Sequence, residues 1–330
     1  MKLKLLPFLL LLTFLFIDTG CEAPRNNIND PLNPDYNFGT IEGVVQSVGI
    51  PSVGISNVSV IWQNANLIAE TDINGRFRLT NIPINNGNLV FSKDGYKADT
   101  LQVVWGTSKR FFTQVFFNRI PTLDSISIYT IVVNQSGLPA VSSLFVKAWI
   151  TDLDDDVDTV FVINEALTLK KPLVSQAENY EVSIFESELG GNQIEGTIGL
   201  DFSIIAKDKF QNEFIIGDAR VTRVITDEVS GLYPSGDSTI LISSQPVILN
   251  WNEFQSGYTF SYMIEVYIRN VLSSELIHTV PDIQSNITSY TLPFNLPEGN
   301  YYWVIWVIDK YQNRSSSKPV LFRIVKPDPP

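Results

Sequence analysis

The chain has 330 residues but only one cysteine, Cys21, and one histidine, His278. A single cysteine excludes a disulfide framework, so the fold must be stabilised by packing. A single histidine excludes zinc sites built from several histidines and the two-histidine motif of metalloproteases. His278 lies in an apolar run with strand character, where a half-exposed structural histidine is favoured over a catalytic one. No nucleophile elbow, phosphate loop or dinucleotide-binding glycine motif occurs either, so the sequence predicts no enzyme.

Positive charge is also scarce. The chain carries 23 Lys and Arg against 35 Asp and Glu, a formal net charge of −12. Nucleic acids and anionic membrane surfaces are bound through clustered Lys and Arg, so we expect no nucleic-acid partner. Aromatic residues are plentiful, with 20 Phe, 12 Tyr and 6 Trp, and they suffice for more than one core. The length favours two or three domains.

No apolar run is long enough to cross a bilayer as a helix, which takes about 20 residues. The longest run near the N-terminus covers residues 5–17 and follows Lys2 and Lys4. A basic start, a short apolar stretch and small residues before a cleavage point are typical of a secretory signal peptide. The sequence therefore predicts a signal peptide over residues 1–20 and an exported protein.

Thr19 and Gly20 directly before Cys21 resemble the lipobox of bacterial lipoproteins, although Asp18 holds the place that is usually aliphatic. The resemblance implies cleavage before Cys21, a lipid on its sulfur and anchoring to a membrane of the cell envelope. The expected location is the outer membrane or cell surface of a Gram-negative bacterium. An ordinary signal peptide with an incidental cysteine, or an uncleaved anchor, is the alternative. Residues 22–38, rich in proline, asparagine and aspartate, are predicted to be a flexible tether behind the lipidated cysteine.

From residue 39 onward, short runs of alternating character are separated by turn dipeptides such as Asn74-Gly75, Asn86-Gly87 and Asp94-Gly95. Such dipeptides supply the positive φ angles of tight turns, and short strands at this spacing are typical of β-sandwiches. We therefore predict an all-β chain with three tandem sandwiches, over residues 39–118, 120–226 and 231–326.

The first block resembles the carboxypeptidase regulatory-like domain through Gly43-Val44-Val45, Val58-Ser59-Val60, the run from Thr71 to Phe77, Ile82-Pro83 and Lys93-Asp94-Gly95-Tyr96. The resemblance implies a transthyretin-like, seven-stranded sandwich that acts as a non-catalytic accessory module. Within it, Asp72 and Gly75 are expected to form a tight turn and Phe77 to enter the core.

The second block resembles the immunoglobulin-like domains of bacterial surface proteins. The third resembles a fibronectin type III domain through Trp251, Tyr290-Thr291-Leu292, Leu296-Pro297-Glu298-Gly299 and Tyr301-Tyr302-Trp303. Both resemblances imply further β-sandwiches of about 100 residues.

The densest acidic cluster lies in the second block. Asp152, Asp154, Asp156 and Asp158 alternate along the chain, and oxygen ligands at every second position suit calcium. A solvated acidic turn between two strands is the favoured interpretation, with a calcium site as the alternative. No other cofactor is expected.

Residues 301–308 are apolar on both faces, whereas a strand at the surface of a simple sandwich should be polar on its outer face. Either another domain or partner covers the second face, or Tyr302 and Trp306 are exposed and contact a ligand such as a sugar. Packing is the favoured interpretation.

The function predicted from the sequence is that of a non-catalytic lipoprotein of the cell envelope, a structural or binding module for a protein or glycan. The alternative is a carbohydrate-active enzyme or an accessory sugar-binding subunit. Without usable histidine chemistry, such an enzyme would rely on paired carboxylates.

Overall fold

The computed structural model describes residues 30, 33, 36–236 and 239–326. The predicted signal peptide, Asp18 and the lipidation site Cys21 lie outside these residues. The chain forms two compact units, Met1–Arg119 and Ile120–Pro330, and each is described by itself. Among the described residues, no helix is long and apolar enough to cross a membrane.

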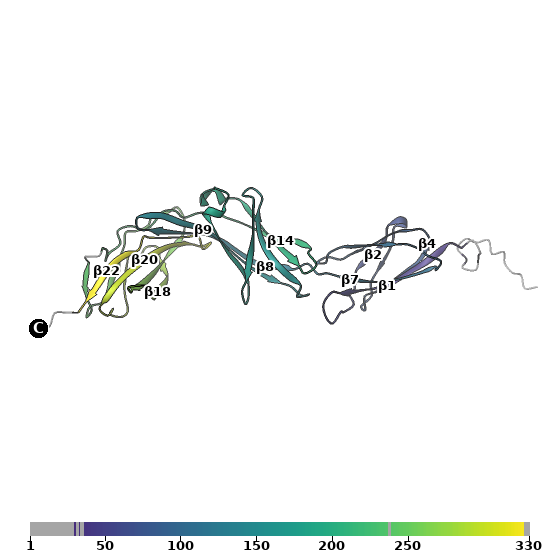
Figure 1. Cartoon of the computed structure of the whole chain (residues 1–330), viewed down its shortest axis with the longest axis horizontal. Coiled ribbons are helices and arrows are strands. Elements are labelled where there is room, and N and C mark those ends of the chain that lie inside the picture. Colours follow the sequence, from purple (N-terminus) through teal and green to yellow (C-terminus); the bar gives the residue numbers. More distant parts are fainter. Residues whose placement is uncertain (1–29, 31–32, 34–35, 237–238, 327–330) are drawn as a thin grey trace, which may run out of the picture. The chain divides into compact units, whose positions relative to one another are not determined.

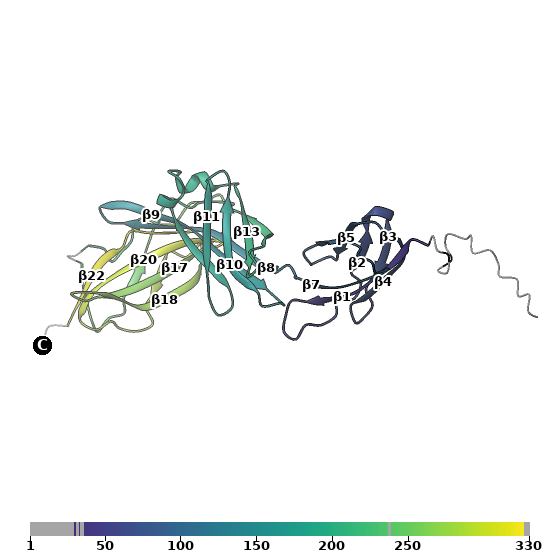
Figure 2. The same cartoon turned by 45° about the vertical axis from the view of Figure 1, so that its right-hand side comes forward.

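Unit 1 is a sandwich of two sheets (Figure 2). One has the order β4-β1-β7, built from β1 (Phe38–Ser47), β4 (Arg76–Pro83) and β7 (Arg110–Phe117). The other has the order β3-β2-β5-β6, built from β2 (Ser59–Trp62), β3 (Leu67–Glu70), β5 (Gly87–Ser92) and β6 (Asp99–Val103). A short 3₁₀ helix, Gln63–Ala65, joins β2 to β3.

The core of unit 1 follows from alternation along these strands, because inward residues of both sheets meet. Trp62, Phe91 and Phe117 are fully buried, and Phe77 is nearly so. The expected turn before β4 is confirmed: Asp72 Oδ1 accepts hydrogen bonds from the backbone N–H groups of Asn74 and Arg76. Gly75 follows with φ +74°, and a Cβ there would lie 2.1 Å from a backbone oxygen, so only glycine fits.

Unit 2 contains two lobes, each with its own hydrophobic core. The first lobe consists of seven strands and two 3₁₀ helices (Figure 1). These are β8 (Thr122–Gln135), β9 (Leu138–Thr151), β10 (Val157–Asn164), β11 (Leu169–Ser175), β12 (Tyr180–Phe185), the helices Glu186–Glu188 and Ile194–Thr197, β13 (Asp201–Asp208) and β14 (Glu213–Arg220).

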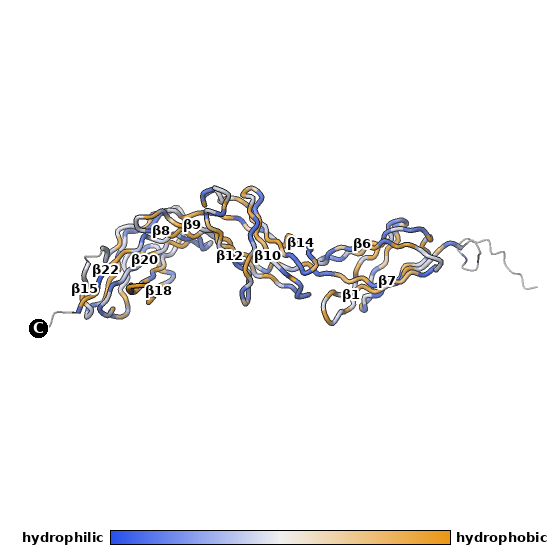
Figure 3. Tube along the Cα trace, viewed as in Figure 1, coloured by the Kyte–Doolittle hydropathy of each residue, from blue (hydrophilic) through white to orange (hydrophobic). Residues whose placement is uncertain are grey.

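The second lobe consists of β15 (Ile240–Ile242), β16 (Ile248–Asn250), β17 (Phe260–Arg269), β18 (Ser274–Gln284), β19 (Ser289–Thr291), β20 (Gly299–Asp309), β21 (Arg314–Ser316) and β22 (Val320–Val325). Its core is rich in aromatic rings, because Trp251 lies edge-on to both Tyr262 and Trp303. Apolar and polar residues alternate along many of the strands of both units (Figure 3). The predicted all-β fold with three sandwich cores is confirmed.

The two lobes of unit 2 share one sheet, in the order β14-β13-β10-β11-β12-β9-β8-β21-β20-β17-β18. The link is a short parallel ladder in which Arg314 pairs with Ile131 and Ser315 with Val132. The β8–β9 hairpin reaches from the first lobe toward β20 in both views (Figures 1 and 2). The two predicted sandwiches, 120–226 and 231–326, therefore both lie within one compact unit.

A buried polar network reinforces this junction. Arg223 lies in the segment between β14 and β15, and its Nη1 donates to Asp309 Oδ2 over 2.8 Å, where the Asp309 side chain is fully buried. The Arg223 guanidinium also stacks on the Tyr258 ring at 4.0 Å. Asn313 Oδ1 accepts a hydrogen bond from the backbone N–H of Thr130 on β8. Because a buried carboxylate needs a partner, the network favours one arrangement of the lobes.

Candidate functional site

A groove lies on the outer face of β17 and β20 in unit 2. We call it the aromatic groove, and its volume is about 480 Å³. The second strand face that the sequence left unexplained, with Tyr302 and Trp306, forms one wall together with Glu265 and Tyr267. The end of the β8–β9 hairpin, from Val133 to Leu138, forms the other wall.

Strand register brings the wall residues together, because side chains of paired residues stand on the same face. Tyr267 on β17 lies directly opposite Tyr302 on β20, and their rings stack with centroids 4.7 Å apart and planes 5° from parallel. Glu265 is two residues from Tyr267 and therefore on the same face. Only the pairing of β17 with β20 assembles this set.

Glu265 is held by the rings on both sides of it. Trp306 Nε1 and the Tyr267 hydroxyl each donate to Glu265 Oε2 over 2.9 Å. Neither bond uses Oε1, which keeps its lone pairs for a donor in the groove. Burial, together with the hydrogen bond to Glu265, raises the pKa of Tyr267 well above its ordinary value, so this phenol stays a neutral donor.

The structure shows partial packing on the second face, and contact of Tyr302 and Trp306 with a ligand stays a prediction. Tyr302 and Trp306 are half-buried. The guanidinium of Arg314 lies 5.4 Å from the Trp306 ring and 5.7 Å from the Tyr129 ring on β8, so the first lobe packs against this face through Arg314. The cover is incomplete, and the aromatic groove is what it leaves open.

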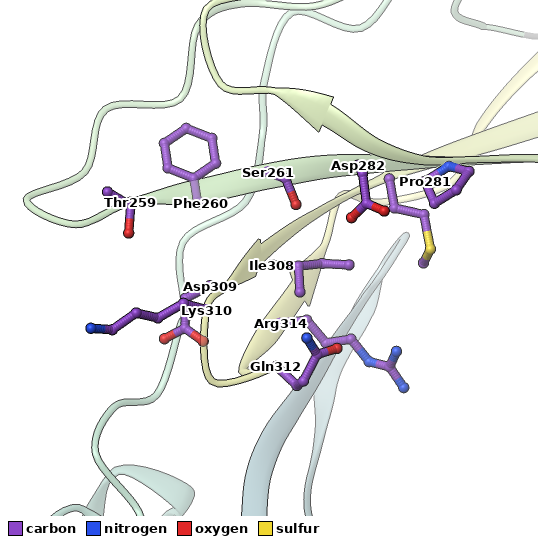
Figure 4. A pocket seen from close by; sticks show the side chains of 11 residues that line it. Thr259, Phe260, Ser261, Pro281, Asp282, Ile308, Asp309, Lys310, Gln312 and Arg314 are labelled. Carbon is purple, nitrogen blue, oxygen red and sulfur yellow. The ribbon is translucent and has the colours of Figure 1, made fainter.

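A second hollow of about 460 Å³ lies farther along the same face (Figure 4). Asp282 from β18 and Ile308 from β20 point into it, with Lys310, Gln312 and Arg314 of the following hairpin at its border. Arg314 contacts Trp306 of the aromatic groove and also lines this hollow. The outer face of the second lobe therefore carries two neighbouring depressions.

The acidic cluster has a different geometry from the one its spacing suggests. Asp152 caps the loop between β9 and β10: its two carboxylate oxygens accept the backbone N–H groups of Asp154, Asp156 and Val157 over 2.7–3.2 Å. Asp158 is exposed and accepts the Thr159 hydroxyl. Among the described residues, no three histidine, cysteine, aspartate or glutamate side chains form a ready metal site.

Asp156 is the exception within this cluster. Its side chain is 4% exposed, and both carboxylate oxygens are buried without a hydrogen-bond partner. Loss of solvation, together with the negative charges of Asp152, Asp208 and Asp154, raises its pKa to about 6, while Lys209 acts in the opposite direction. A calcium ion bound by Asp152, Asp154, Asp156 and Asp158 stays a prediction.

Asp208 belongs to a five-residue repeat that the sequence analysis missed. Asp208-Lys-Phe-Gln-Asn212 recurs as Asp309-Lys-Tyr-Gln-Asn313, a signal that comparison of the two blocks would have revealed. In both copies the asparagine N–H and side-chain amide donate to the aspartate carboxylate. The glutamine has φ of +70° in one copy and +73° in the other.

His278 lies on β18, half-buried, with its ring against Tyr290 and Phe294. These contacts are those of a residue packed at the edge of a core, as the sequence favoured.

Comparisons with known proteins leave the family of this chain open. No protein-family model matches it, and no curated protein matches it. Among solved structures, the FN1–FN3 domains of chicken CNTN1 are similar over 83% of this chain and 94% of theirs, with 9% identity and a TM-score of 0.34. The fibronectin(III)-like modules of Clostridium thermocellum CbhA cover 63% of this chain and 94% of theirs, with 15% identity and a TM-score of 0.31. BcpA, the major pilin subunit of Bacillus cereus, covers 87% and 97%, with 11% identity and a TM-score of 0.24. TM-scores this low carry no argument about function.

Proposed function

We propose that this chain is a non-catalytic binding module that holds a neutral glycan in the aromatic groove of unit 2. The observation that carries the proposal is the combination of three half-buried rings, Tyr267, Tyr302 and Trp306, with a carboxylate fixed between them. A sugar ring has an apolar C–H face, which packs on aromatic rings, and a rim of hydroxyl donors, which Glu265 Oε1 can accept.

The lining of the groove favours a neutral ligand. Of the described residues that line it, Glu265 alone is charged, and the far wall adds the amide of Gln135 and the hydroxyl of Ser136. An anionic ligand would meet repulsion from Glu265, and the cation beside Trp306, Arg314, does not line the groove. The charge of the groove therefore fits hydroxyl-rich, uncharged sugars.

A peptide bound as an added strand fits less well. Such binding needs an unpaired strand edge, whose backbone groups hydrogen-bond the peptide. β17 is paired on both sides, with β18 and β20, and β20 is paired with β17 on one side and with β21 and β22 on the other. The groove thus presents side chains, as sugar recognition requires, and not free backbone.

The carboxylate count favours binding over catalysis. Glycoside hydrolysis by the common mechanism uses two carboxyl groups on opposite sides of the scissile bond, about 5–9.5 Å apart. Among the described residues that line the groove, Glu265 is the only acid. We therefore propose a binding role in place of the enzymatic alternative.

The proposal includes the setting expected from the sequence. The chain is exported, lipidated on Cys21 and held at the cell envelope, with unit 1 as a carboxypeptidase regulatory-like accessory module. Labelling cells with a palmitate analogue tests this part: the wild type should be labelled, and Cys21→Ala should lose both the label and membrane association. Label on the variant would refute lipidation at Cys21.

A glycan array followed by isothermal titration calorimetry tests the groove itself. Trp306→Ala and Tyr302→Ala should each weaken binding at least tenfold, whereas Tyr311→Ala, which removes an exposed ring outside the groove, should bind as the wild type does. Glu265→Gln should weaken binding of neutral sugars while keeping the fold. Equal binding by Trp306→Ala and Tyr311→Ala, or a wild type that retains no glycan, would contradict the proposal.

A further inference from the structure

The two copies of the Asp-Lys-aromatic-Gln-Asn turn offer a comparison within one chain. In the second lobe, the turn begins with Asp309, which is 2% exposed. The Arg223 guanidinium lies 2.8 Å from Asp309 Oδ2 and neutralises the buried charge. This arrangement meets the general requirement that a buried carboxylate be paired with a cation or with several donors.

In the first lobe, the same turn begins with Asp208, which is fully buried. It accepts the backbone N–H and the side-chain amide of Asn212 over 2.7 and 2.6 Å, as its counterpart does with Asn313. The group near this turn, however, is another acid. Asp208 pairs in register with Val157, and the Lys209 N–H donates to the Asp156 carbonyl over 2.8 Å, so Asp156 lies beside the turn.

Asp156 thus brings negative charge near Asp208, whereas Asp309 in the second lobe is paired with a guanidinium. Its two carboxylate oxygens are both buried and accept no hydrogen bond from any described residue. Lys209 attracts this carboxylate, but its Nζ donates to the Asp155 carbonyl over 2.7 Å. The buried Asp156 carboxylate therefore has no hydrogen-bond donor among the described residues. The other acids near it are Asp152, Asp154 and Asp208.

We propose that a divalent cation, calcium among the biological ions, binds at Asp156 between the β9–β10 loop and the Asp208 turn. Asp156 supplies the two uncommitted oxygens, and Asp152 and Asp208 add charge while keeping their hydrogen bonds to the backbone. The proposed site leaves out Asp158, which is exposed and accepts the Thr159 hydroxyl. The cation does for the first lobe what Arg223 does for the second.

The donor set indicates calcium and a modest affinity. Calcium takes six to eight oxygen ligands and accepts backbone carbonyls and water beside carboxylates, so it does not require three acid side chains. Magnesium demands closer octahedral geometry and gives up its water reluctantly. Because only one of the site's described carboxylates, that of Asp156, is free of other hydrogen bonds, the dissociation constant should be on the order of 10⁻³ M, the range of extracellular calcium modules.

Thermal unfolding with and without calcium tests the site. With calcium at about 10 mM, the transition of unit 2 should rise by about 3–6 °C relative to EDTA. Asp156→Asn should abolish the rise, and Asp158→Asn should retain it. A wild type that does not respond, or an Asp156→Asn variant that responds as the wild type does, would overturn the proposal.

Equilibrium dialysis against calcium gives a second measurement that does not depend on unfolding. The wild type and Asp158→Asn should each retain one calcium ion per chain, and Asp156→Asn none. Retention that is lost in both variants would favour the four alternating carboxylates over the proposed site, and retention that is kept in Asp156→Asn would overturn the proposal. The site is independent of the aromatic groove, so its failure would leave the glycan proposal standing.

Discussion

The buried carboxylate of Asp156 gives the sharpest test of how charge and burial combine in this protein. Without a bound cation, the folded state should hold this group less readily in its ionised form, since its pKa rises from 3.8 to about 6. One pKa unit corresponds to about 1.4 kcal/mol, so the difference amounts to about 3 kcal/mol at neutral pH. Any water that reaches the loop would solvate the Asp156 carboxylate and make this free-energy difference smaller.

The sign follows from proton linkage. Because its pKa is higher in the folded state, Asp156 binds a proton more tightly there than in the unfolded chain. Its contribution is therefore most favourable below about pH 4, declines as the pH rises to about 6, and is fully unfavourable above that. Asp156→Asn removes the charge and keeps the size of the side chain. In EDTA at pH 7.5, the variant should be more stable than the wild type by about 2–3 kcal/mol, and at pH 4 the two should be nearly equal.

Urea unfolding of the full chain, followed through the transition of unit 2, measures this difference. Asp158→Asn is the matched control, because it removes the same charge from an exposed position in the same loop. Its effect should stay within about 0.5 kcal/mol at either pH. A cost of burying the Asp156 charge is refuted if Asp156→Asn has no higher free energy of unfolding than Asp158→Asn at pH 7.5. It is also refuted if the difference between Asp156→Asn and the wild type does not change with pH.

Two further predictions concern a buried ion pair in unit 2 and a glycine in unit 1, and both are measured as free energies of unfolding. Arg223→Ala leaves the fully buried Asp309 carboxylate without its cation and should cost about 3–5 kcal/mol, whereas Arg220→Ala, which breaks an exposed ion pair, should cost about 0–1 kcal/mol. Equal costs would show that the buried pair does not hold the lobes together. Gly43→Ala in unit 1 places a Cβ 2.4 Å from a backbone carbonyl oxygen and should destabilise the unit by about 1–3 kcal/mol. Gly106→Ala, where nothing lies within 4 Å, should change little, and a matching loss there would contradict the steric argument.

Local features of the fold could be read from the sequence because their causes are local. The tight turns at Gly75 and Gly95 require a positive φ, which glycine adopts readily. The glycines in the sequence therefore predicted these turns. Phe77 alternates with polar neighbours and is buried as expected. The scarcity of cysteine and histidine likewise excludes a disulfide framework and metal sites built from several histidines.

The candidate sites could be predicted only in part, because they depend on which strands become neighbours. The sequence singled out Tyr302 and Trp306 by the apolar second face of their strand, but Tyr267 and Glu265 joined them only through the register of β17 with β20. The spacing of the acidic residues suggested a solvated turn, with four carboxylates converging on one cation as the alternative. Backbone geometry instead made Asp152 a cap, left Asp158 in solvent and buried Asp156.

The sequence by itself therefore determined the all-β class, the turns and the residues of each core, because alternation and turn chemistry act over a few residues. Only the tertiary structure decided that the second and third blocks share one sheet and that a hairpin of one partly covers the aromatic face of the other. It also decided that Asp309 meets a guanidinium while Asp208 lies beside another acid. The physical reason is that strand pairing joins residues far apart in the chain, and no local pattern encodes which distant charges will share a buried space.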